Sequence, residues 1–205
     1  VYGGAVRAGL SGKGMQSTMK QTFVLDVGGT SIKYGIISGE GKLFDEKETP
    51  THAEEGGKAL LGRIVALVRG HCGAFEAIGV STCGQVNRAE GSILYATDNV
   101  PGYTGTQVGK TLREIFRCPV AVENDVNAAA LGESRFGAAK GFDNFLCVTY
   151  GTGIGGAIVL GGQLYAGKNG SAGELGHMIT HAGGKPCTCG GHGCYEAYGS
   201  TGALS

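Results

Sequence analysis

Asp125 is the residue whose type and position point most directly to chemistry. It lies in residues 122–130 (VENDVNAAA), where an apolar strand-like run ends and a helical pattern begins. A carboxylate at such a junction can accept the proton of an alcohol that attacks a phosphoryl group. An Asp beside a helix start can instead cap the helix, so both uses stay open at this point.

Glycine-rich turns lie on both sides of Asp125 in the sequence, at residues 26–33 (DVGGTSIK) and 151–156 (GTGIGG). Each adjoins an apolar β-like run, and glycine backbone lets an anion approach closely because it lacks a Cβ. Neither turn has the spacing of a P-loop or of a dinucleotide-binding fingerprint, and a lone glycine turn is commonly only a hairpin. Combined with Asp125, the two turns predict a site that holds a phosphate from two sides.

Three of the seven cysteines form a cluster at Cys187, Cys189 and Cys194, with glycines between them that permit a tight wrap. Three thiolates and one imidazole make a closed tetrahedral zinc site, which leaves no open position for a reactive water. A disulfide with one free thiol is the alternative. The pattern therefore favours structural zinc. The histidines near enough in sequence to complete it are His177, His181 and His192.

Composition excludes several classes of protein. The 205 residues carry 17 basic and 17 acidic side chains, so the formal charge is zero, and 41% of them are hydrophobic. A neutral chain offers no electrostatic footprint for nucleic acid or an anionic membrane, and no apolar run is long enough to span a bilayer. We therefore expect a cytoplasmic protein whose partners are small molecules or copies of itself.

The elements that must position these residues follow from hydrophobic periodicity. Residues 1–18 show no periodicity, and we interpret them as a disordered or vector-derived leader with Met19 as the natural start. Patterns of period two predict an antiparallel meander, and helical spacing predicts helices that pack on it. The expected strands are 22–27, 31–38, 42–49, 77–81 and 118–122, and the expected helices are near 59–68, 106–116 and 126–136.

From residue 144 the pattern of strand, glycine turn and strand begins again, with Gly161 and Gly162 closing a further hairpin. This echo of the opening meander predicts two related lobes. We place the boundary near Pro119, so that 19–118 forms an N-terminal α/β lobe with the first phosphate turn. Residues 119–205 then form a partial C-terminal lobe with Asp125, the second turn and the cysteine cluster.

The turns and Asp125, together with residues 173–178 (GELGHM) and 187–196 (CTCGGHGCYE), resemble the ROK (repressor, open reading frame, kinase) family of sugar kinases. The resemblance runs from about Phe23 to the last residue. It implies the α/β, two-lobed actin-like ATPase (ribonuclease H-like) fold. Members of this family continue beyond the point where this chain stops, so the resemblance also implies an incomplete second lobe.

The resemblance implies an ATP-dependent kinase that transfers the γ-phosphate to a hexose hydroxyl, with Asp125 as base and Mg²⁺ bound with ATP. Asp26 is the expected Mg²⁺ ligand, directly or through water, because Mg²⁺ commonly combines one or two carboxylates with substrate phosphates. Lys33 either neutralises phosphate or lies on a solvated strand face. The expected phosphate and Mg²⁺ residues are Asp26, Gly28, Gly29, Thr30, Lys33, Gly151, Thr152, Gly153 and Gly155.

The sugar pocket and the fourth zinc ligand also follow from the resemblance, which selects His177 beside the three cysteines. Zinc there would clamp the loop that carries the sugar contacts. The expected sugar-binding residues are Gly84, Asn99, Asn124, Asp125, Glu174, His177 and Glu196. Cys83 and Gln85 stand where many members carry prolines, which changes the sugar-side loop. Without a paired base, we interpret Cys83 as a small core residue.

The sequence leaves more than one sugar acceptor and more than one class of protein open. Glucose, an N-acetylhexosamine and a β-glucoside all fit as acceptors, each phosphorylated at the 6-hydroxyl. Residues 103–106 are somewhat more similar to β-glucoside or N-acetylmannosamine kinases. A ROK transcriptional repressor would use the same pocket for an inducer but needs a winged helix-turn-helix, which the leader is too short to form. A non-catalytic sugar-binding fragment is the third alternative. Members are often dimers, so a homodimer is the implied assembly.

Overall fold

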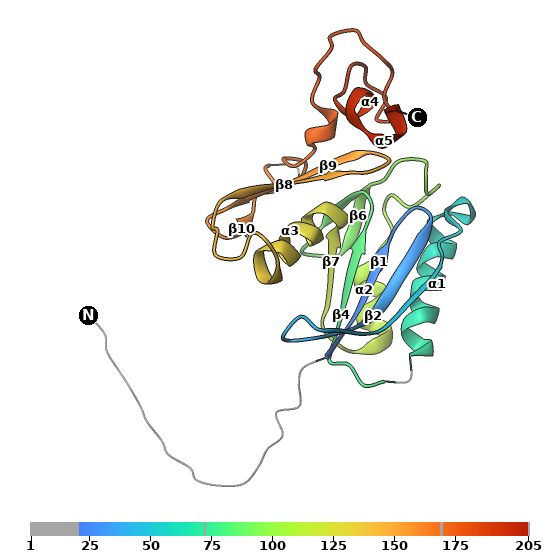
Figure 1. The fold of residues 1–205 in the computed structure, drawn as a ribbon. Coiled ribbons are helices and arrows are strands. Elements are labelled where there is room, and N and C mark those ends of the chain that lie inside the picture. Colours follow the sequence, from blue (N-terminus) through green and yellow to red (C-terminus); the bar gives the residue numbers. More distant parts are fainter. Residues whose placement is uncertain (1–20, 72, 169, 205) are drawn as a thin grey trace.

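A computed structural model describes residues 21–71, 73–168 and 170–204 of the chain, and the predicted leader lies outside them. The larger of its sheets has five strands in the order β3-β2-β1-β4-β7 (Figure 1). These strands are β1 (Gln21–Val27), β2 (Ser31–Ser38), β3 (Leu43–Pro50), β4 (Ala77–Thr82) and β7 (Val120–Asn124).

The first three strands form the predicted antiparallel meander, while β4 and β7 run parallel to β1. The parallel ladder aligns Asp26 on β1 with Ser81 on β4, and Ser81 with Glu123 on β7. The carboxyl ends of three strands therefore meet at one edge of the sheet. Ligands of open α/β sheets bind outside such an edge.

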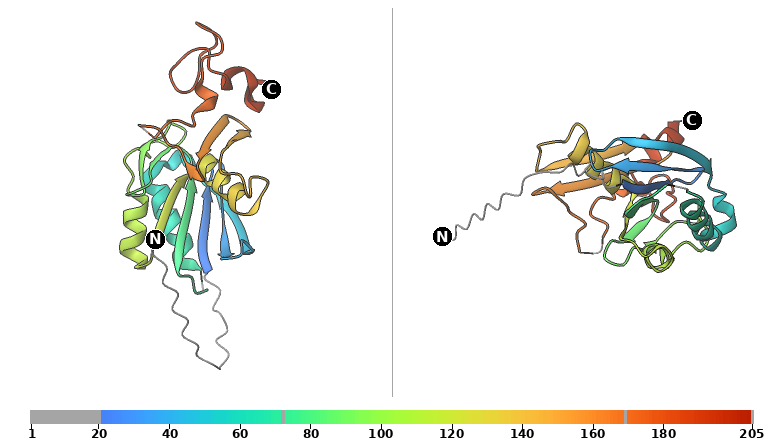
Figure 2. Two further views of the ribbon diagram at one scale, coloured as in Figure 1. Left: turned by 90° about the vertical axis from the view of Figure 1, so that its left-hand side faces the viewer. Right: turned by 90° about the horizontal axis from the view of Figure 1, so that it is seen from below.

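Two helices cover one face of this sheet, namely α1 (Gly56–Gly70), preceded by the short helix η1 (Ala53–Glu55), and α2 (Val108–Phe116). Figure 2 shows both on the same side. Side chains alternate along β1, so Phe23, Leu25 and Val27 point to the helices and are buried. The helices add Leu60, Ile64 and Leu112 to this core. Apolar burial of this kind is the main driving force for folding.

The hairpin of β5 (Gln85–Asn87) and β6 (Ser92–Tyr95) follows β4 and leads to α2. It approaches α2 so closely that a Cβ on Gly91 would lie 2.8 Å from the Cα of Gly109. Gly91 also has a φ of 73°, which other residues rarely adopt. Glycine at this position therefore lets the hairpin pack on the helix.

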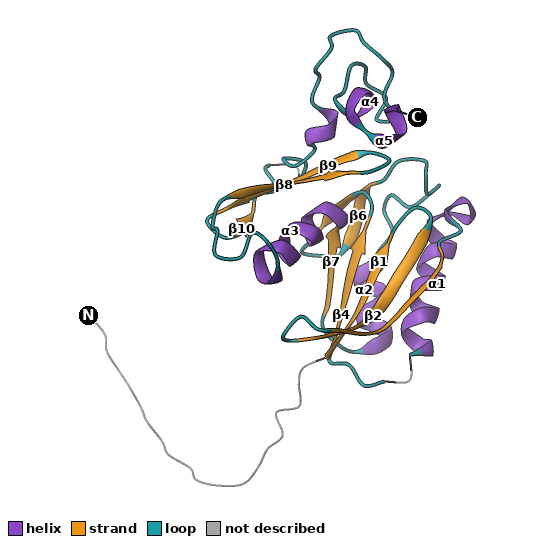
Figure 3. Cartoon of the chain, in the orientation of Figure 1, coloured by secondary structure: helices purple, strands orange, loops and turns teal. Residues whose placement is uncertain are grey.

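A smaller sheet contains β8 (Phe145–Tyr150), β9 (Ile154–Leu160) and β10 (Gln163–Leu164) in the order β10-β9-β8. Helix α3 (Asp125–Phe136) packs on it through Ala130, which is buried with Ala157 and Val159. Long loops then lead from β10 to η2 (Leu175–His177) and from η2 to α4 (Glu196–Gly199) (Figure 3). Ser200 alone separates α4 from α5 (Thr201–Leu204). Among the described helices, none is both long and apolar enough to cross a membrane.

The structure differs from the sequence expectation around Pro119. Strand β7 begins at Val120 and ends at Asn124, two residues later than expected at both ends. Proline has no N–H for a ladder, and its carbonyl only accepts a bond from the Ile78 N–H at 2.9 Å. Because β7 pairs with β4, it belongs to the five-stranded sheet of the N-terminal residues and not to the three-stranded sheet that follows it in the sequence. The position of a lobe boundary stays a prediction.

Candidate functional site

Asp26 and Asp125 lie at the same edge of the five-stranded sheet. Asp26 is the penultimate residue of β1, and its Oδ1 accepts a hydrogen bond of 2.7 Å from the Ser81 hydroxyl. Asp125 follows β7 directly and opens α3. The two carboxylates are close enough for the charge of Asp26 to act on Asp125. Strand order therefore joins residues that are far apart in the sequence.

The surroundings of Asp125 raise the pKa of its carboxyl above the usual value. Loss of hydration is the largest cause, the Val126 N–H opposes it, and the negative charge of Asp26 adds to it. Asp125 is nevertheless exposed, so solvent screens part of this effect. A carboxylate with a raised pKa is a stronger proton acceptor, which is what a general base requires.

Asn124 caps α3, so the main capping role that competed with catalysis does not belong to Asp125. Its Oδ1 accepts from the backbone N–H groups of Val126 and Asn127 at 3.0 and 3.1 Å. Its Nδ2 donates to the Gly84 carbonyl at 3.1 Å and to Asp125 Oδ1 at 2.8 Å. Both donors and both lone pairs of the amide are used. Asn124 thus orients Asp125 and ties it to the loop after β4.

Glu123 anchors the other side of this turn. Its Oε2 forms an ion pair with Arg88, and its Oε1 accepts from the Asn124 N–H at 2.9 Å and from Asn127 Nδ2 at 3.1 Å. Only 12% of the Glu123 side chain is exposed. Charged hydrogen bonds of a largely buried carboxylate hold geometry strongly. The β5 hairpin is thereby fixed to the start of α3.

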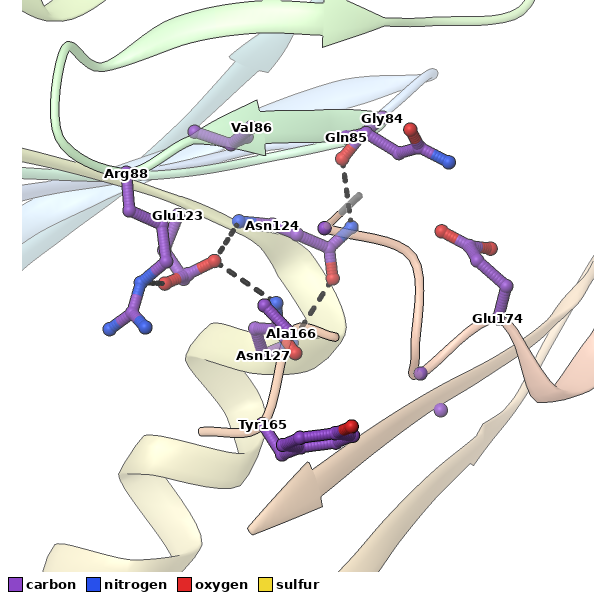
Figure 4. A pocket seen from close by; sticks show the side chains of 13 residues that line it. Gly84, Gln85, Val86, Arg88, Glu123, Asn124, Asn127, Tyr165, Ala166 and Glu174 are labelled. Carbon is purple, nitrogen blue, oxygen red and sulfur yellow. Dashed lines mark hydrogen bonds and ion pairs between the residues drawn. The ribbon is translucent and has the colours of Figure 1, made fainter. Parts of the chain in front are cut away.

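A polar pocket of about 430 Å³, its open side included, lies beside this turn (Figure 4). Its size is within the range of small-molecule sites. Three of the predicted sugar-binding residues line it, namely Gly84, Asn124 and Glu174. The other polar residues of its wall were not among the predicted site residues, because no motif singled them out as sugar contacts. These are Gln85, Arg88, Glu123, Asn127 and Tyr165.

Glu174 projects into the pocket, where Figure 4 shows it near Gln85. Burial raises the pKa of the Glu174 carboxyl, the charge of His177 opposes this, Asp125 adds to it, and a hydrogen bond from Gln85 lowers it. The charges of Asp125 and Glu174 therefore reach each other. Gln85 supplies an amide donor that a proline at this position would lack.

The remaining predicted sugar-binding residues lie outside the pocket wall. Asn99 is exposed in the loop after β6, and His177 and Glu196 make contacts in other directions, described below. Their part in sugar binding stays a prediction. Cys83 packs against the main core, and burial and then Asp125 raise the pKa of its thiol. A thiol that is harder to ionise is a poor nucleophile, which fits the interpretation of Cys83 as a core residue.

The first glycine turn joins β1 to β2 and is anchored from below. Gly28 donates to the Ser31 carbonyl at 3.0 Å, and its own carbonyl accepts from the Thr51 hydroxyl at 2.7 Å. Thr51 is fully buried and also donates its N–H to the Thr30 carbonyl. Gly29 and Thr30 are exposed, and space around Gly29 is open. The turn therefore presents bare backbone to solvent while Thr51 holds it.

Lys33 is exposed on β2, directly opposite Asp26 in the antiparallel ladder. Cross-strand partners share a face of the sheet, so the lysine and Asp26 lie on the same face. This placement is compatible with a contact to phosphate and with a solvated strand face. Both interpretations of Lys33 therefore stay open.

The second glycine turn joins β8 to β9, and Figure 1 shows both hairpin tips at the upper right of the molecule. Gly151 donates to the Gly153 carbonyl at 2.9 Å, and Thr152 is exposed. A Cβ on Gly155 would lie 2.3 Å from a methyl group of Val126 on α3. This glycine therefore lets the turn pack directly behind Asp125.

The residues of the predicted metal-binding cluster, His177, Cys187, Cys189 and Cys194, come together, and their potential ligand atoms all lie within 4.8 Å of one another. The Sγ atoms of Cys189 and Cys194 are 3.7 Å apart, and Cys187 Sγ is 3.6 Å from His177 Nδ1. A tetrahedral zinc ion has edges of about 3.8 Å between sulfurs and about 3.6 Å between sulfur and nitrogen. The geometry therefore fits structural zinc.

The orientation of His177 links this cluster to the pocket. Its Nδ1 faces the thiols, while its Nε2 lies 4.0 Å from Glu174 Oε2. A carboxylate behind a metal-binding imidazole fixes the orientation of the ring. The other two histidines are placed elsewhere: His181 stacks on Tyr198 with centroids 4.0 Å apart, and His192 is exposed. Neither belongs to the cluster.

Comparison with known proteins agrees with this geometry. The ROK family model matches residues 22–205. The chain is 37% identical to a glucokinase of Streptomyces coelicolor over 91% of its length, and 33% identical to an N-acetylmannosamine kinase of Shigella boydii over 87%. It spans 58% and 61% of the lengths of these two relatives.

Solved structures are similar as well. A ROK family glucokinase from Streptomyces griseus, in complex with glucose and AMPPNP, has a TM-score of 0.80 at 36% identity, over 90% of this chain and 58% of that one. A ROK family transcriptional regulator, a homologue of the E. coli MLC protein, has a TM-score of 0.77 at 27% identity, over 91% and 48%. The α/β actin-like ATPase fold is thus confirmed, and the chain belongs to the ROK family.

Proposed function

We propose that this chain is part of an ATP-dependent sugar kinase that transfers the γ-phosphate to a hexose hydroxyl, at O6 of the sugar. One observation carries the proposal. Asp125, a carboxylate with a raised pKa, lies at the sheet edge beside both Asp26 and a polar pocket. The kinases among the relatives support the reaction class.

In this reaction Asp125 accepts the proton of the sugar hydroxyl as its oxygen attacks the γ-phosphorus. The bond between that phosphorus and the bridging oxygen of ADP breaks, and ADP leaves. Asn124 and Glu123 hold the base in place through the bonds described above. Fixed orientation of this kind supplies much of the rate of phosphoryl transfer.

The phosphates are assigned to the two glycine turns and Mg²⁺ to Asp26. Ser81 orients the Asp26 carboxylate through one oxygen, so the other is available to the cation or to its water shell. Mg²⁺ bound there would neutralise the phosphate charge that develops during transfer. Lys33 is also assigned to phosphate, with less support than the other residues, because its exposed position on β2 fits a solvated strand face equally well.

The acceptor is a hexose with a free 6-hydroxyl, and glucose, an N-acetylhexosamine and a β-glucoside are the candidates. A glucokinase and an N-acetylmannosamine kinase are similar to the chain at 37% and 33% identity, which supports both of the first two. Gln85, Arg88 and Tyr165 line the pocket and are the side chains that would distinguish ring substituents. Zinc in the cysteine cluster would hold the Glu174 loop and take no part in the reaction.

A sugar-sensing role is the second candidate. The structural similarity to a transcriptional regulator of the same family supports it, since a regulator would use such a pocket for an inducer. A sugar-binding chain without catalysis is the related third candidate. All three share the pocket and differ in whether ATP is consumed.

The test is a coupled assay of ADP release with glucose, N-acetylmannosamine, N-acetylglucosamine and a β-glucoside. We expect sugar-dependent ADP release, with Asp125→Asn lowering kcat by about 10²- to 10⁴-fold. Asp143→Asn is the matched control, because Asp143 is an exposed carboxylate before β8, away from the pocket. Equal loss in both variants would contradict the assignment of the base. Sugar binding without ADP release would favour the sensing candidates, and DNA binding would favour the repressor.

A further inference from the structure

The carboxylate of Glu196 rests on the second glycine turn. Its Oε2 accepts a hydrogen bond of 2.8 Å from the Ile154 N–H, across 42 residues of sequence. A Cβ on Gly153 would lie 2.4 Å from the same oxygen, so the turn is bare where the carboxylate meets it. Glu196 is absent from the pocket wall, which Glu174 lines. The expected sugar contact of Glu196 stays a prediction, and the bond that its Oε2 makes in this structure is to the second glycine turn.

The segment after Glu196 contacts the same turn at further points. Thr201 donates its N–H to the Gly151 carbonyl at 2.9 Å. A Cβ on Gly199 would lie 3.3 Å from the Ile154 side chain. Residues of α4 and α5 thus bind one N–H of the turn, that of Ile154, and one carbonyl of the turn, that of Gly151. The conformation of the turn depends on where these two short helices lie.

The other end of this connection is the metal-binding cluster. Glu196 comes two residues after Cys194, which is 2% exposed and has its Sγ 3.7 Å from that of Cys189. Between them, Tyr195 donates its N–H to the Met178 carbonyl at 2.8 Å, and its hydroxyl is 2.8 Å from that of Tyr150. Closing the ligand set would therefore fix Glu196 as well. Structural metal sites order the segments that supply their ligands.

We propose that Glu196 is a positioning residue that couples the cysteine–histidine cluster to the second glycine turn. Metal in the cluster holds Cys194, Cys194 holds the start of α4, and the Glu196 carboxylate holds the Ile154 N–H. The turn is then ordered only when the cluster is closed. Any effect of this coupling on phosphate binding rests on the proposed function, whereas the coupling between the cluster and the turn does not.

Hydrogen exchange on peptides that cover residues 150–156 tests the coupling without any substrate. In the zinc-loaded chain, Glu196→Ala is expected to speed exchange of the turn about tenfold or more, because a charged acceptor is lost. Glu196→Gln keeps an amide oxygen in the same place and is expected to stay within about threefold of wild type. Glu133→Ala is the control, since it removes a carboxylate bond to the Ala138 N–H elsewhere.

Metal removal provides the second arm. Chelation of zinc is expected to speed exchange of the turn in wild type by about the same factor as Glu196→Ala, and to add little to that variant. Exchange at the first glycine turn, residues 27–31, should stay unchanged throughout. The proposal is overturned if Glu196→Ala leaves the second turn protected, if chelation acts equally in both chains, or if the chain binds no zinc. These exchange measurements need no substrate, so they test the coupling even if the chain has no kinase activity.

Discussion

The two sheets of the molecule differ in how much holds them together. The five-stranded sheet and its helices bury seventeen apolar residues of the described chain in one core, whereas the three-stranded sheet and α3 bury three. On the face of the small sheet away from α3, Leu146, Val148 and Tyr150 are exposed. Small cores rarely suffice alone, and metals commonly supplement them. One half of the site therefore rests on a large buried core, whereas the other half depends on a few individual hydrogen bonds.

The two glycine turns show the same contrast. The first is anchored by Thr51, a fully buried residue beside the main core. The second is anchored by Glu196, which belongs to a four-residue helix next to the metal-binding cluster. Asp125 opens α3 between these regions, and Asn124 ties it to Gly84 of the first. The proposed base is therefore tied to the half with the larger core, while one of the two proposed phosphate turns depends on the half with the smaller core.

The largest expected effect separates a buried side chain of the main core from an exposed side chain of the small sheet. Leu60→Ala removes a fully buried side chain from the main core and should lower the free energy of unfolding by about 2–5 kcal/mol. Leu146→Ala removes an equal volume from a side chain that is 63% exposed, and should change it by less than about 0.5 kcal/mol. Urea denaturation followed by circular dichroism measures both. Similar losses of unfolding free energy in the two variants would contradict the stated difference between the two sheets.

Periodicity predicted the elements because alternation and helical spacing are local properties of the chain. It placed the meander, α1 to α3 and the β8–β9 hairpin within a few residues of where they lie. Helix α1 starts at Gly56, before its first apolar residue, because Gly57 lies against the backbone of Tyr103, where a Cβ would come within 2.5 Å. No local pattern reveals such a contact.

The site was predicted as a set of residue types, but not as a set of bonds. The compact motifs of the sequence singled out Asp26, Asp125 and the three clustered cysteines, and the family resemblance added His177, which the structure places beside those cysteines. It could not assign Asn124 to capping, Glu196 to the second turn or Thr51 to the first, since these bonds join distant segments. Register and strand order create them, and both are properties of the folded chain.

A smaller effect tests the anchor of the first turn. Thr51→Val keeps the shape of the side chain but leaves the Gly28 carbonyl without the hydroxyl that it accepts from. The free energy of unfolding should fall by about 1–3 kcal/mol, because a buried acceptor loses its partner. Thr180→Val is the control, since Thr180 is exposed and its hydroxyl contacts only His181 and the Gly193 carbonyl, at 3.1 and 3.4 Å, away from the main core. An unchanged midpoint for Thr51→Val would mean that the turn does not depend on the main core.

The smallest effect concerns Asp125, where the two regions meet. Its folded-state pKa is raised, so ionisation costs the native state more than the unfolded chain. This cost is absent below the unfolded pKa of about 3.9, grows as the pH rises from that value to the raised folded pKa, and is fully present above it. Asp125→Asn keeps an oxygen for the Asn124 and Val126 donors but cannot ionise. It should therefore be more stable than wild type at pH 7 and equal to it near pH 3, as urea midpoints at the two values will measure. A gain that persists at pH 3 would come from packing, and the raised pKa would then lend no support to the proposed role of Asp125 as a base.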